Sequence, residues 1–436
     1  MRILTIDIGT GTQDILLFDS DGPVENGAQL VMPAPTQIVA QAVRAATNTR
    51  VPIALHGTLM GGGPCHWAVE DHLRAGLAVY ATPGAAATFN DDLDWVAREM
   101  GVQLLADDEL AALPAAVQRI RMGDLNLAAI NAALAAFGIA PDYAGVAVAV
   151  FDHGNAPPDV SDRVFRFNYL AERFSTGRGL LALGFTRDAV PAAMTRLRAV
   201  ADTLPAGLEA VLMDTAPAAV LGALDDPHVA AQPDVLVANV GNFHCLAFHL
   251  VEGAIAGCFE HHTGELKPGQ LETLLTRLGN GTLTNREVFE SMGHGALVLH
   301  PTPNSRPFLA VTGPRRALLS GSALGPYFAV PHGDMMLAGC FGLLRTQLTG
   351  MCSCRSPLCS STLPKYVPVG WLPPSMVTVK VAVPRAGTMK LAGSTVICAP
   401  AGAVVVITQV VSRLRTLRTV RVTLWRPGIT GSEILG

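Results

Sequence analysis

The sequence is poor in charged residues and nearly devoid of lysine. Charged residues make up 15% of its 436 residues, the formal net charge is −4, and Lys267 is the single lysine before residue 347. A chain of this kind has no basic surface that could neutralise the phosphates of a nucleic acid, so we expect no nucleic-acid partner. The sequence also lacks GxxxxGK[ST], which excludes the commonest phosphate-binding loop of nucleotide-binding proteins.

Signals for export and for membrane insertion are also weak. The first apolar strand begins at once and carries Arg2 and Asp7, which is unlike a signal peptide. The eight cysteines are irregularly spaced, as expected for reduced thiols in a cytoplasmic protein. The uncharged run Leu391–Ser412 is long enough to span a bilayer, but its Ser, Thr, Pro and Gln residues make a membrane location unexpected.

The most informative pattern lies in residues 2–18, where two apolar strands flank a turn of glycines and threonines. Glycine can adopt positive φ and lets backbone N–H groups approach an anion, and threonine adds a hydroxyl donor. An aspartate before the turn supplies an oxygen ligand suited to Mg²⁺. The pattern predicts a phosphate-binding hairpin, and the alternative is a glycine turn that only reverses the chain. The turn reads Asp7-Ile8-Gly9-Thr10-Gly11-Thr12.

The same pattern recurs after a polar turn at Asp225-Asp226-Pro227. Residues 235–248 match residues 3–18 if the second turn is two residues shorter, and a third strand follows in both copies. This internal repeat predicts a duplicated α/β domain with a βββ start in each copy. We therefore expect domains at 1–226 and 227–346, followed by an atypical extension at 347–436.

Hydrophobic periodicity and capping residues place the remaining elements. We expect a loop from His56 to Pro64, and a helix of residues 91–100 that is closed by Gly101. Further helices are expected at 36–49, from the cap Asp124 to Phe137, at 188–203, 216–224, 268–278 and 284–292, and from the cap Asp334 to Leu344. Further strands are expected at 51–55, 77–80, 143–151, 209–213 and 308–311.

The extension at 347–436 differs from the rest in composition. Glu433 is its only acidic residue, and it holds half of the cysteines, at 352, 354, 359 and 398. One interpretation is a small appended β domain with strands at 377–383 and 403–411. The other is a non-native translation, which would also explain the abrupt loss of acidic residues.

The two Asp/Asn-x-Gly hairpins, each opening a βββαβα unit, resemble the superfamily of sugar and acetate kinases, actin and heat-shock chaperones. The resemblance implies two ribonuclease-H-like domains that close on ATP and Mg²⁺ in a central cleft. It places residues 7–12 in the first phosphate motif. It places Asn239, Gly241 and Asn242 in the second, where an acid is usual, and Gly313 and Arg315 in the adenosine motif, where paired glycines are usual.

Several phrases resemble one prokaryotic family labelled "putative pyruvate formate-lyase activating enzyme". They are IDIGTGTQDILLFD, HGTLMGGGP, NVGNFHCLAF, CFEHHTG, VTGPRR and GDMMLAGCFGLL. A radical activating enzyme needs CxxxCxxC to hold its iron–sulfur cluster. The only cysteine cluster here is CSCRSPLC, which is spaced CxCx₄C. The resemblance therefore implies the family without implying radical chemistry.

Candidate catalytic groups follow predicted strands. Asp7 is expected to hold Mg²⁺ and orient the γ-phosphate, and Asp152 and Glu260 are candidate acids or bases near it. His261 and His262 are metal-ligand types, but neighbours on a strand point to opposite faces, so both cannot face one ion. The alternatives are a turn-capping role for Asp7, a plain turn at Asp152 and a solvated loop at 260–263.

These patterns lead to three functional hypotheses. The first is an ATP-binding enzyme, a kinase or an ATPase, that acts with Mg²⁺ on an unknown small-molecule acceptor. The second is a nucleotide-gated activator, whose closing domains alter a partner protein. The third is a scaffold that kept the fold and lost the nucleotide site, which Asn239 and the single glycine at 313 favour.

Overall fold

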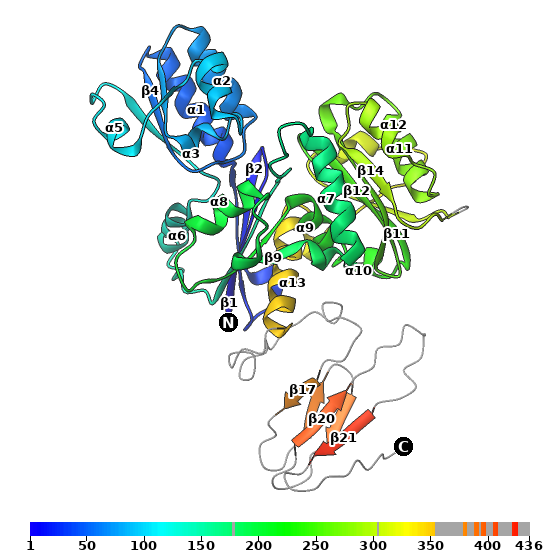
Figure 1. Cartoon of the computed structure of the whole chain (residues 1–436). Coiled ribbons are helices and arrows are strands. Elements are labelled where there is room, and N and C mark those ends of the chain that lie inside the picture. Colours follow the sequence, from blue (N-terminus) through cyan, green and yellow to red (C-terminus); the bar gives the residue numbers. More distant parts are fainter. Residues whose placement is uncertain are drawn as a thin grey trace. The chain divides into compact units, whose positions relative to one another are not determined.

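A computed structural model describes residues 1–176, 179–302 and 305–353, and five strands between residues 378 and 425. The chain divides into two compact units, Met1–Tyr366 and Val367–Gly436 (Figure 1). Among the described residues, no helix is both long enough and apolar enough to cross a membrane. Parts of the run 391–412 form short strands, and its remainder lies outside the described residues.

The first lobe of the larger unit is built on a six-stranded sheet in the order β3-β2-β1-β8-β10-β9. β1, β2 and β3 form an antiparallel meander, while β8 lies parallel to β1 and β10 parallel to β8. The central strand β8 reads GVAVAV and is buried throughout, as expected for a strand covered on both faces. The strands are β1 (Arg2–Ile8), β2 (Thr12–Asp19), β3 (Ala28–Pro33), β8 (Gly145–Val150), β9 (Gly184–Thr186) and β10 (Glu209–Met213).

The second lobe repeats this arrangement in the order β14-β13-β12-β11-β15-β16. Again three strands form an antiparallel meander and the next main strand, β15, lies parallel to the first. The expected duplicated ribonuclease-H-like fold is therefore confirmed, and β14 is an addition at the sheet edge that the sequence analysis missed. The strands are β11 (Asp234–Val240), β12 (His244–Val251), β13 (Ala254–His262), β14 (Gly295–Val298), β15 (Phe308–Thr312) and β16 (Tyr327–Phe328).

The two hairpins have turns of equal length, so the expected two-residue shortening is wrong. Asp7 pairs with Asp14 across the first hairpin, and Asn239 pairs with Leu246 across the second, at the same separation along the chain. The repeat thus equates Asp7 with Asn239 and Asp14 with Leu246. Both acids belong to the first copy only.

A separate four-stranded parallel sheet, in the order β6-β5-β4-β7, is inserted between β3 and β8. It has its own apolar core and its own helices, which Figure 1 shows grouped together. The expected loop begins two residues later than expected, because His56 and Gly57 belong to β4, and it ends where α2 begins. The helix expected over 91–100 is shorter, an α-helical turn at Leu93–Trp95 continued by a π-helical turn at Val96–Met100, and it ends at the left-handed Gly101 as expected. The elements are α1 (Pro35–Asn48), β4 (Ile53–Gly57), α2 (Pro64–Arg74), β5 (Val79–Ala81), α3 (Pro83–Ala86), β6 (Gln103–Leu104) and β7 (Gln118–Met122).

Three helices of the first lobe differ from expectation. The cap of α6 (Leu127–Ala136) is Asn126, because the side chain of Asp124 is engaged by Arg196 instead. α8 (Thr195–Thr203) begins later than expected, after a short 3₁₀ turn at 187–189. α7 (Asp162–Thr176) was not expected, although its buried Phe167, Leu170 and Phe174 follow a helical period.

Two helices cross between the lobes. α9 (Thr215–Ala223) ends the first lobe and packs on β11 and β15 of the second, while α13 (Ala338–Ser353) packs on β1, β2, β8 and β10 of the first. α13 begins four residues after the expected cap Asp334, which instead accepts a hydrogen bond from the backbone N–H of Met336. The helices meet so closely that a Cβ atom at Gly222 or Gly342 would clash with a backbone carbonyl oxygen of the other helix. Each lobe is therefore covered by the final helix of the other.

The smaller unit contains two antiparallel sheets, β17-β20-β21 and β18-β19. The expected strands at 377–383 and 403–411 are present as β17 and β20. The segment CSCRSPLC lies outside the described residues from Cys354 onward. The strands are β17 (Thr378–Val381), β18 (Thr388–Leu391), β19 (Ser394–Ile397), β20 (Val404–Thr408) and β21 (Arg421–Trp425).

Candidate functional site

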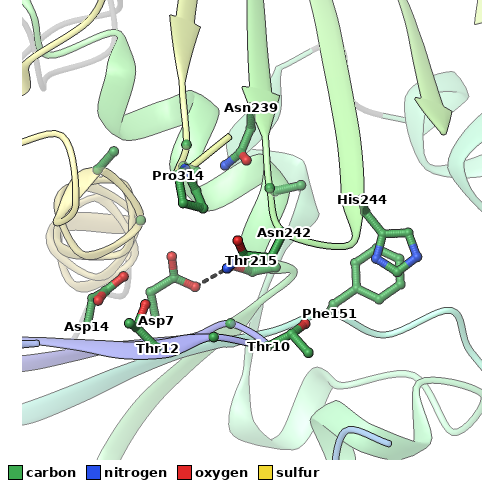
Figure 2. Close-up of a pocket in the computed structure, with 18 of the residues that line it drawn as sticks. Asp7, Thr10, Thr12, Asp14, Phe151, Thr215, Asn239, Asn242, His244 and Pro314 are labelled. Atoms are coloured by element: carbon green, nitrogen blue, oxygen red, sulfur yellow. Dashed lines mark hydrogen bonds between the residues drawn. The ribbon is translucent and has the colours of Figure 1, made fainter. Parts of the chain in front are cut away.

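A cleft of about 830 Å³, its open mouth included, lies between the turns of the two hairpins. Its walls come from both turns, the end of β15, and the beginnings of α9 and α13. Figure 2 shows the first hairpin on one side and the second on the other, with their polar side chains facing across the gap. The predicted residues that line it are Asp7, Gly9, Thr10, Gly11, Thr12, Asn239, Gly241, Asn242 and Gly313.

The two turns share one backbone geometry. In the first, the N–H of Gly9 donates to the carbonyl of Thr12 at 2.9 Å. In the second, the N–H of Gly241 donates to the carbonyl of His244, also at 2.9 Å. A Cβ atom on Gly11 would lie 2.6 Å from the amide nitrogen of Asn242, so the two tips approach closely. The cleft therefore has two matching glycine turns as opposed walls.

Asp7 and Asp14 form a buried acid pair at the base of the cleft. Asp7 accepts a hydrogen bond from the hydroxyl of Thr215 at the start of α9. Gly339 of α13 lies so close to the Asp7 carboxylate that a Cβ atom there would overlap it. Asp14 is 8% exposed, and its Oδ1 has no hydrogen-bond partner among the described residues. Two buried carboxylates, one of them partly unsatisfied, are suited to a hard cation such as Mg²⁺.

Burial dominates the acidity of this pair. It raises the pKa of Asp7 to about 7, against the lowering effect of the Thr215 hydrogen bond. It raises the pKa of Asp14 to about 8, and the neighbouring charge of Asp7 adds to the shift. Such carboxylates destabilise the folded protein at neutral pH unless a cation compensates them. Groups of this kind gather at functional sites.

The acid pair predicts an unusual dependence of stability on pH. Because the folded-state pKa of Asp14 is raised, the folded protein binds the proton more tightly than the unfolded chain, and stability falls as pH rises from about 4 to about 8. Asparagine cannot ionise, so we expect Asp14→Asn to gain stability relative to the natural protein, by about 4 kcal/mol between pH 5 and pH 8.5. Urea unfolding at the two pH values, without divalent cations, measures this gain.

The matched control is Asp202→Asn, at an exposed aspartate of α8. Its stability should track that of the natural protein at both pH values, because the side chain stays in water when the protein folds. If the Asp14→Asn curve also runs parallel to that of the natural protein, the buried acid pair does not titrate as described.

A cation also lines the cleft, although the sequence offered no lysine to clamp phosphate in the first domain. Arg196 of α8 makes a bidentate ion pair with Asp124, at 2.7 and 2.8 Å, and donates to the carbonyl of Phe151 at 2.6 Å. A Cβ atom on Gly61 would meet its guanidinium, so the 61–63 loop packs against this cation. Arg196 thus adds a fixed positive charge to the wall of the cleft.

The expected adenosine motif is divided between the cleft and the surface. Gly313 has φ of +98°, and a Cβ atom there would lie 2.6 Å from the carbonyl of Val240, so only glycine fits. Gly313 and Pro314 line the cleft, while Arg315 is exposed and does not line it. The backbone N–H of Arg315 donates to the carbonyl of Val240 at 2.9 Å, which fixes the loop to β11.

Asp152 and Glu260 do not line the cleft. Both carboxylate oxygens of Asp152 accept backbone N–H groups, from Gly154 and Leu197, each at 2.8 Å. Burial raises the pKa of Asp152 above its ordinary value. The structure gives this side chain a role in holding the start of α8, and its role as a catalytic acid stays a prediction.

Glu260 belongs to a buried ionic network that joins the lobes. Arg166 of α7 pairs with Glu260 of the second lobe at 2.9 Å, and with Asp214 of the first lobe at 2.7 Å. On the other side of Glu260, Oε1 lies 2.7 Å from Nδ1 of His294. Burial alone would raise the pKa of Glu260, but the charges of Arg166 and His294 outweigh burial and lower it well below normal.

The two adjacent histidines of β13 point to opposite faces, as expected for a strand. His261 is buried, and its ring nitrogens bond to the backbone carbonyls of His262 and Ser291. The ring of His262 lies on the other face, 5.0 Å from the ring of His244 and 4.5 Å from that of His294. The geometry keeps His261 and His262 from sharing an ion.

Several site residues were missed because their neighbours are distant in sequence. Thr215 contacts Asp7, Arg196 contacts Asp124, and His294 contacts Glu260 only after folding. A signal existed for Thr215, which follows a predicted strand and the helix cap Asp214. No comparable local pattern marks Arg196 or His294.

The comparisons with solved structures give matches of low identity and low TM-score. Solved structures similar to this chain include the ethanolamine utilization protein EutJ from Carboxydothermus hydrogenoformans, at 14% identity, 79% coverage of this chain, 89% of that chain and a TM-score of 0.26. The ROK hexokinase from Thermus thermophilus is 11% identical, with 58% of this chain and 47% of that chain covered and a TM-score of 0.21. Lmo2764 from Listeria monocytogenes, described as a putative N-acetylmannosamine kinase, is 11% identical, with 80% of this chain and 99% of that chain covered and a TM-score of 0.30. No curated protein matches the sequence.

The family itself is defined by sequence. Residues 60–318, more than half of the chain, match the family described as "Putative pyruvate format-lyase activating enzyme (DUF1786)". The chain belongs to this family, as the sequence resemblance implied.

Proposed function

We propose that this protein binds Mg²⁺ and ATP in the cleft between its two glycine turns and acts as an ATPase or phosphotransferase. The observation that carries the proposal is the asymmetry of the duplication. Two matching turns face each other, but only the first is flanked by the buried acids Asp7 and Asp14. A site for a triphosphate and one metal ion needs this combination of two phosphate clamps and one set of oxygen ligands.

Each wall of the cleft has a distinct part in the proposal. Backbone N–H groups of the turns at 9–12 and 241–244 would hold the phosphates, with Asn242 as an added donor. Asp7 and Asp14 would hold Mg²⁺, directly or through water. Arg196 would offset charge on the transferred phosphoryl group. The loop at Gly313 would receive the adenosine. The expected cytoplasmic location, where ATP is available, is part of this proposal.

The test is titration calorimetry with Mg–ATP. We expect Asp7→Asn to weaken binding roughly 30-fold, about 2 kcal/mol, because asparagine keeps the shape and removes the charge that holds the metal. Asp202→Asn should bind as the natural protein does. Equal affinity in Asp7→Asn and the natural protein, with both folded by circular dichroism, would reject the assignment of Asp7.

The second hairpin favours a second candidate function. Among the described residues lining the cleft, the acids are Asp7 and Asp14, and the counterparts in the second copy are Asn239 and Leu246. Asn239 can donate to phosphate but cannot act as a base, so turnover would be slow. A slow ATPase suits a nucleotide-gated activator, in keeping with the family description. Release of labelled phosphate, with and without small-molecule acceptors, separates the two candidates.

A further inference from the structure

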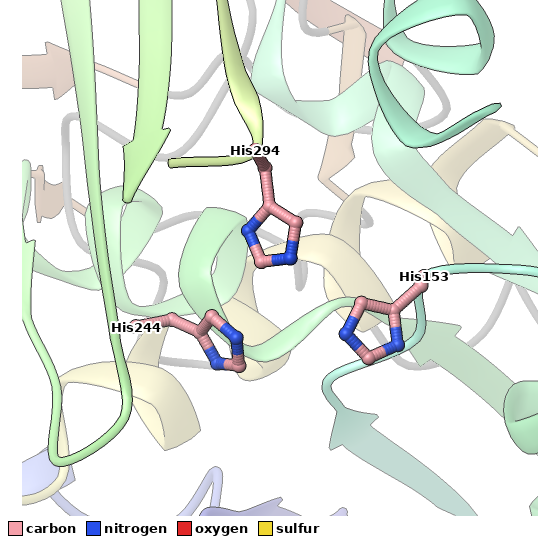
Figure 3. A group of neighbouring side chains, drawn as sticks. All are labelled: His153, His244 and His294. Atoms are coloured by element: carbon pink, nitrogen blue, oxygen red, sulfur yellow. The ribbon is translucent and has the colours of Figure 1, made fainter. Parts of the chain in front are cut away.

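Three histidines from the two lobes converge beside the cleft. His153 follows β8 of the first lobe, His244 begins β12 of the second, and His294 precedes β14 (Figure 3). One ring nitrogen of each lies within 4.8 Å of the others. The ring centroids are separated by 5.1 to 6.0 Å. Such convergence from three separate chain segments is what a metal centre requires.

Two of the three side chains, His153 and His244, lie in surroundings that favour the neutral imidazole that a metal ion binds. Burial lowers the pKa of His153 to about 3 and lowers the pKa of His244 well below its ordinary value. Nε2 of His244 is buried and has no hydrogen-bond partner among the described residues. The ring of His244 stacks on Phe151 with centroids 4.1 Å apart, which fixes its plane. A buried neutral imidazole with an unused nitrogen is costly unless it binds a proton donor or a metal ion.

The carboxylate of Glu260 contacts the ring of His294. Oε1 of Glu260 lies 2.7 Å from Nδ1 of His294, which leaves Nε2 of that ring for an ion. Metal-bound histidines commonly have a carboxylate beside their second nitrogen, and Glu260 is such a neighbour, as an ion pair without hydrogen-bond geometry. The carboxylates of Glu260 and Asp214 share a single guanidinium, that of Arg166.

We propose that His153, His244 and His294 bind a divalent transition-metal ion, with Zn²⁺ as the ion best matched to three imidazoles. Ligand bonds of about 2.1 Å place the nitrogens about 3.4 Å apart, so closure requires small rotations of the rings. Because His244 also lines the cleft, the fourth position of the ion opens toward it and takes water or an oxygen of a bound substrate. This ion is separate from the Mg²⁺ proposed at Asp7.

The site ties the two lobes together, because His153 comes from the first and the other two ligands from the second. It goes beyond the proposed ATP function and does not depend on it. Metal binding is measured without nucleotide, so failure here leaves the Mg–ATP titration unaffected, and failure there leaves this site unaffected.

The experiment titrates Zn²⁺ by calorimetry into full-length protein that carries no histidine tag and has been stripped with a chelator. The cysteines at 352, 354 and 359 are replaced by serine throughout, because their CxCx₄C spacing could bind Zn²⁺ independently. We expect one ion per chain, with visible Co²⁺ absorption at the same stoichiometry. His153→Ala and His294→Ala should each abolish the site, and Glu260→Gln should weaken it by about 10- to 100-fold.

The control is His300→Ala, at an exposed histidine outside the group, which should retain full binding. Circular dichroism confirms folding of each variant, and His153→Asn serves if the alanine variant fails to fold. The proposal is overturned if the folded background protein binds no ion. It is equally overturned if the folded double variant His153→Ala, His294→Ala still binds one.

Discussion

Replacing Arg166 with methionine should lower the free energy of unfolding by about 3–5 kcal/mol, because the change leaves two buried carboxylates without their cation. Arg166 is 2% exposed and pairs with both Asp214 and Glu260, and it also donates to the carbonyl of Asp152 at 2.8 Å. Methionine fills similar space but returns none of these bonds. Urea unfolding at pH 7 measures the loss.

Two further variants show how much of the stability lost in Arg166→Met comes from the missing ion pairs and how much from changed packing. Arg286→Met removes an exposed arginine that pairs with Glu290, and it should change stability by less than about 0.5 kcal/mol. Adding Asp214→Asn to Arg166→Met removes one stranded charge and should recover part of the loss. A loss below about 1 kcal/mol in Arg166→Met would show that the network is not desolvated as described.

Gly222→Ala should destabilise the protein by about 3 kcal/mol, at the upper end of the cost of overpacking. The new methyl group would clash with the backbone carbonyl of Ala338, and no flexible side chain is there to yield. The helices α9 and α13 must then separate, which disturbs both sheets. Thermal unfolding followed by circular dichroism gives the size of the effect.

Gly264→Ala is the matched control for this substitution, because a Cβ atom there meets nothing within 4 Å. Gly342→Ala, whose Cβ atom would clash with the carbonyl of Ala218, should cost about as much as Gly222→Ala. Combining the two should cost less than their sum, since the first change already separates the helices. Additive losses would mean that the two glycines do not act at one contact.

The hairpins and their duplication could be predicted because they are local. Asp7, Gly9 and Gly11 lie within a few residues of one another, and the repeat at 235–248 supplies an internal comparison. The predicted length of the second turn was wrong because it was based on residue similarity and not on strand register. Register is set by pairing across the whole hairpin, where Leu246 takes the place of Asp14.

Long-range partners could not be predicted in the same way. Arg166 lies 48 residues from Asp214 and 94 from Glu260, so nothing near it in sequence shows that its charge is compensated inside the protein. Asp152 and Glu260 were chosen as polar groups after strands. Asp152 does follow β8, but Glu260 lies within β13 and is paired on both sides. Whether such a group faces the cleft or a buried partner depends on the packing of α7 and α8, and only the folded chain fixes that.

The crossing of α9 and α13 limits how the two lobes can move. The last helix of each lobe packs on the sheet of the other lobe. The lobes therefore cannot separate without exposing apolar residues on both sides. A rotation of the lobes about the point where Gly222 and Gly342 meet keeps α9 and α13 packed on their sheets. A protein cut at the polar turn 225–227 should accordingly yield two fragments that remain poorly folded apart and regain structure when mixed.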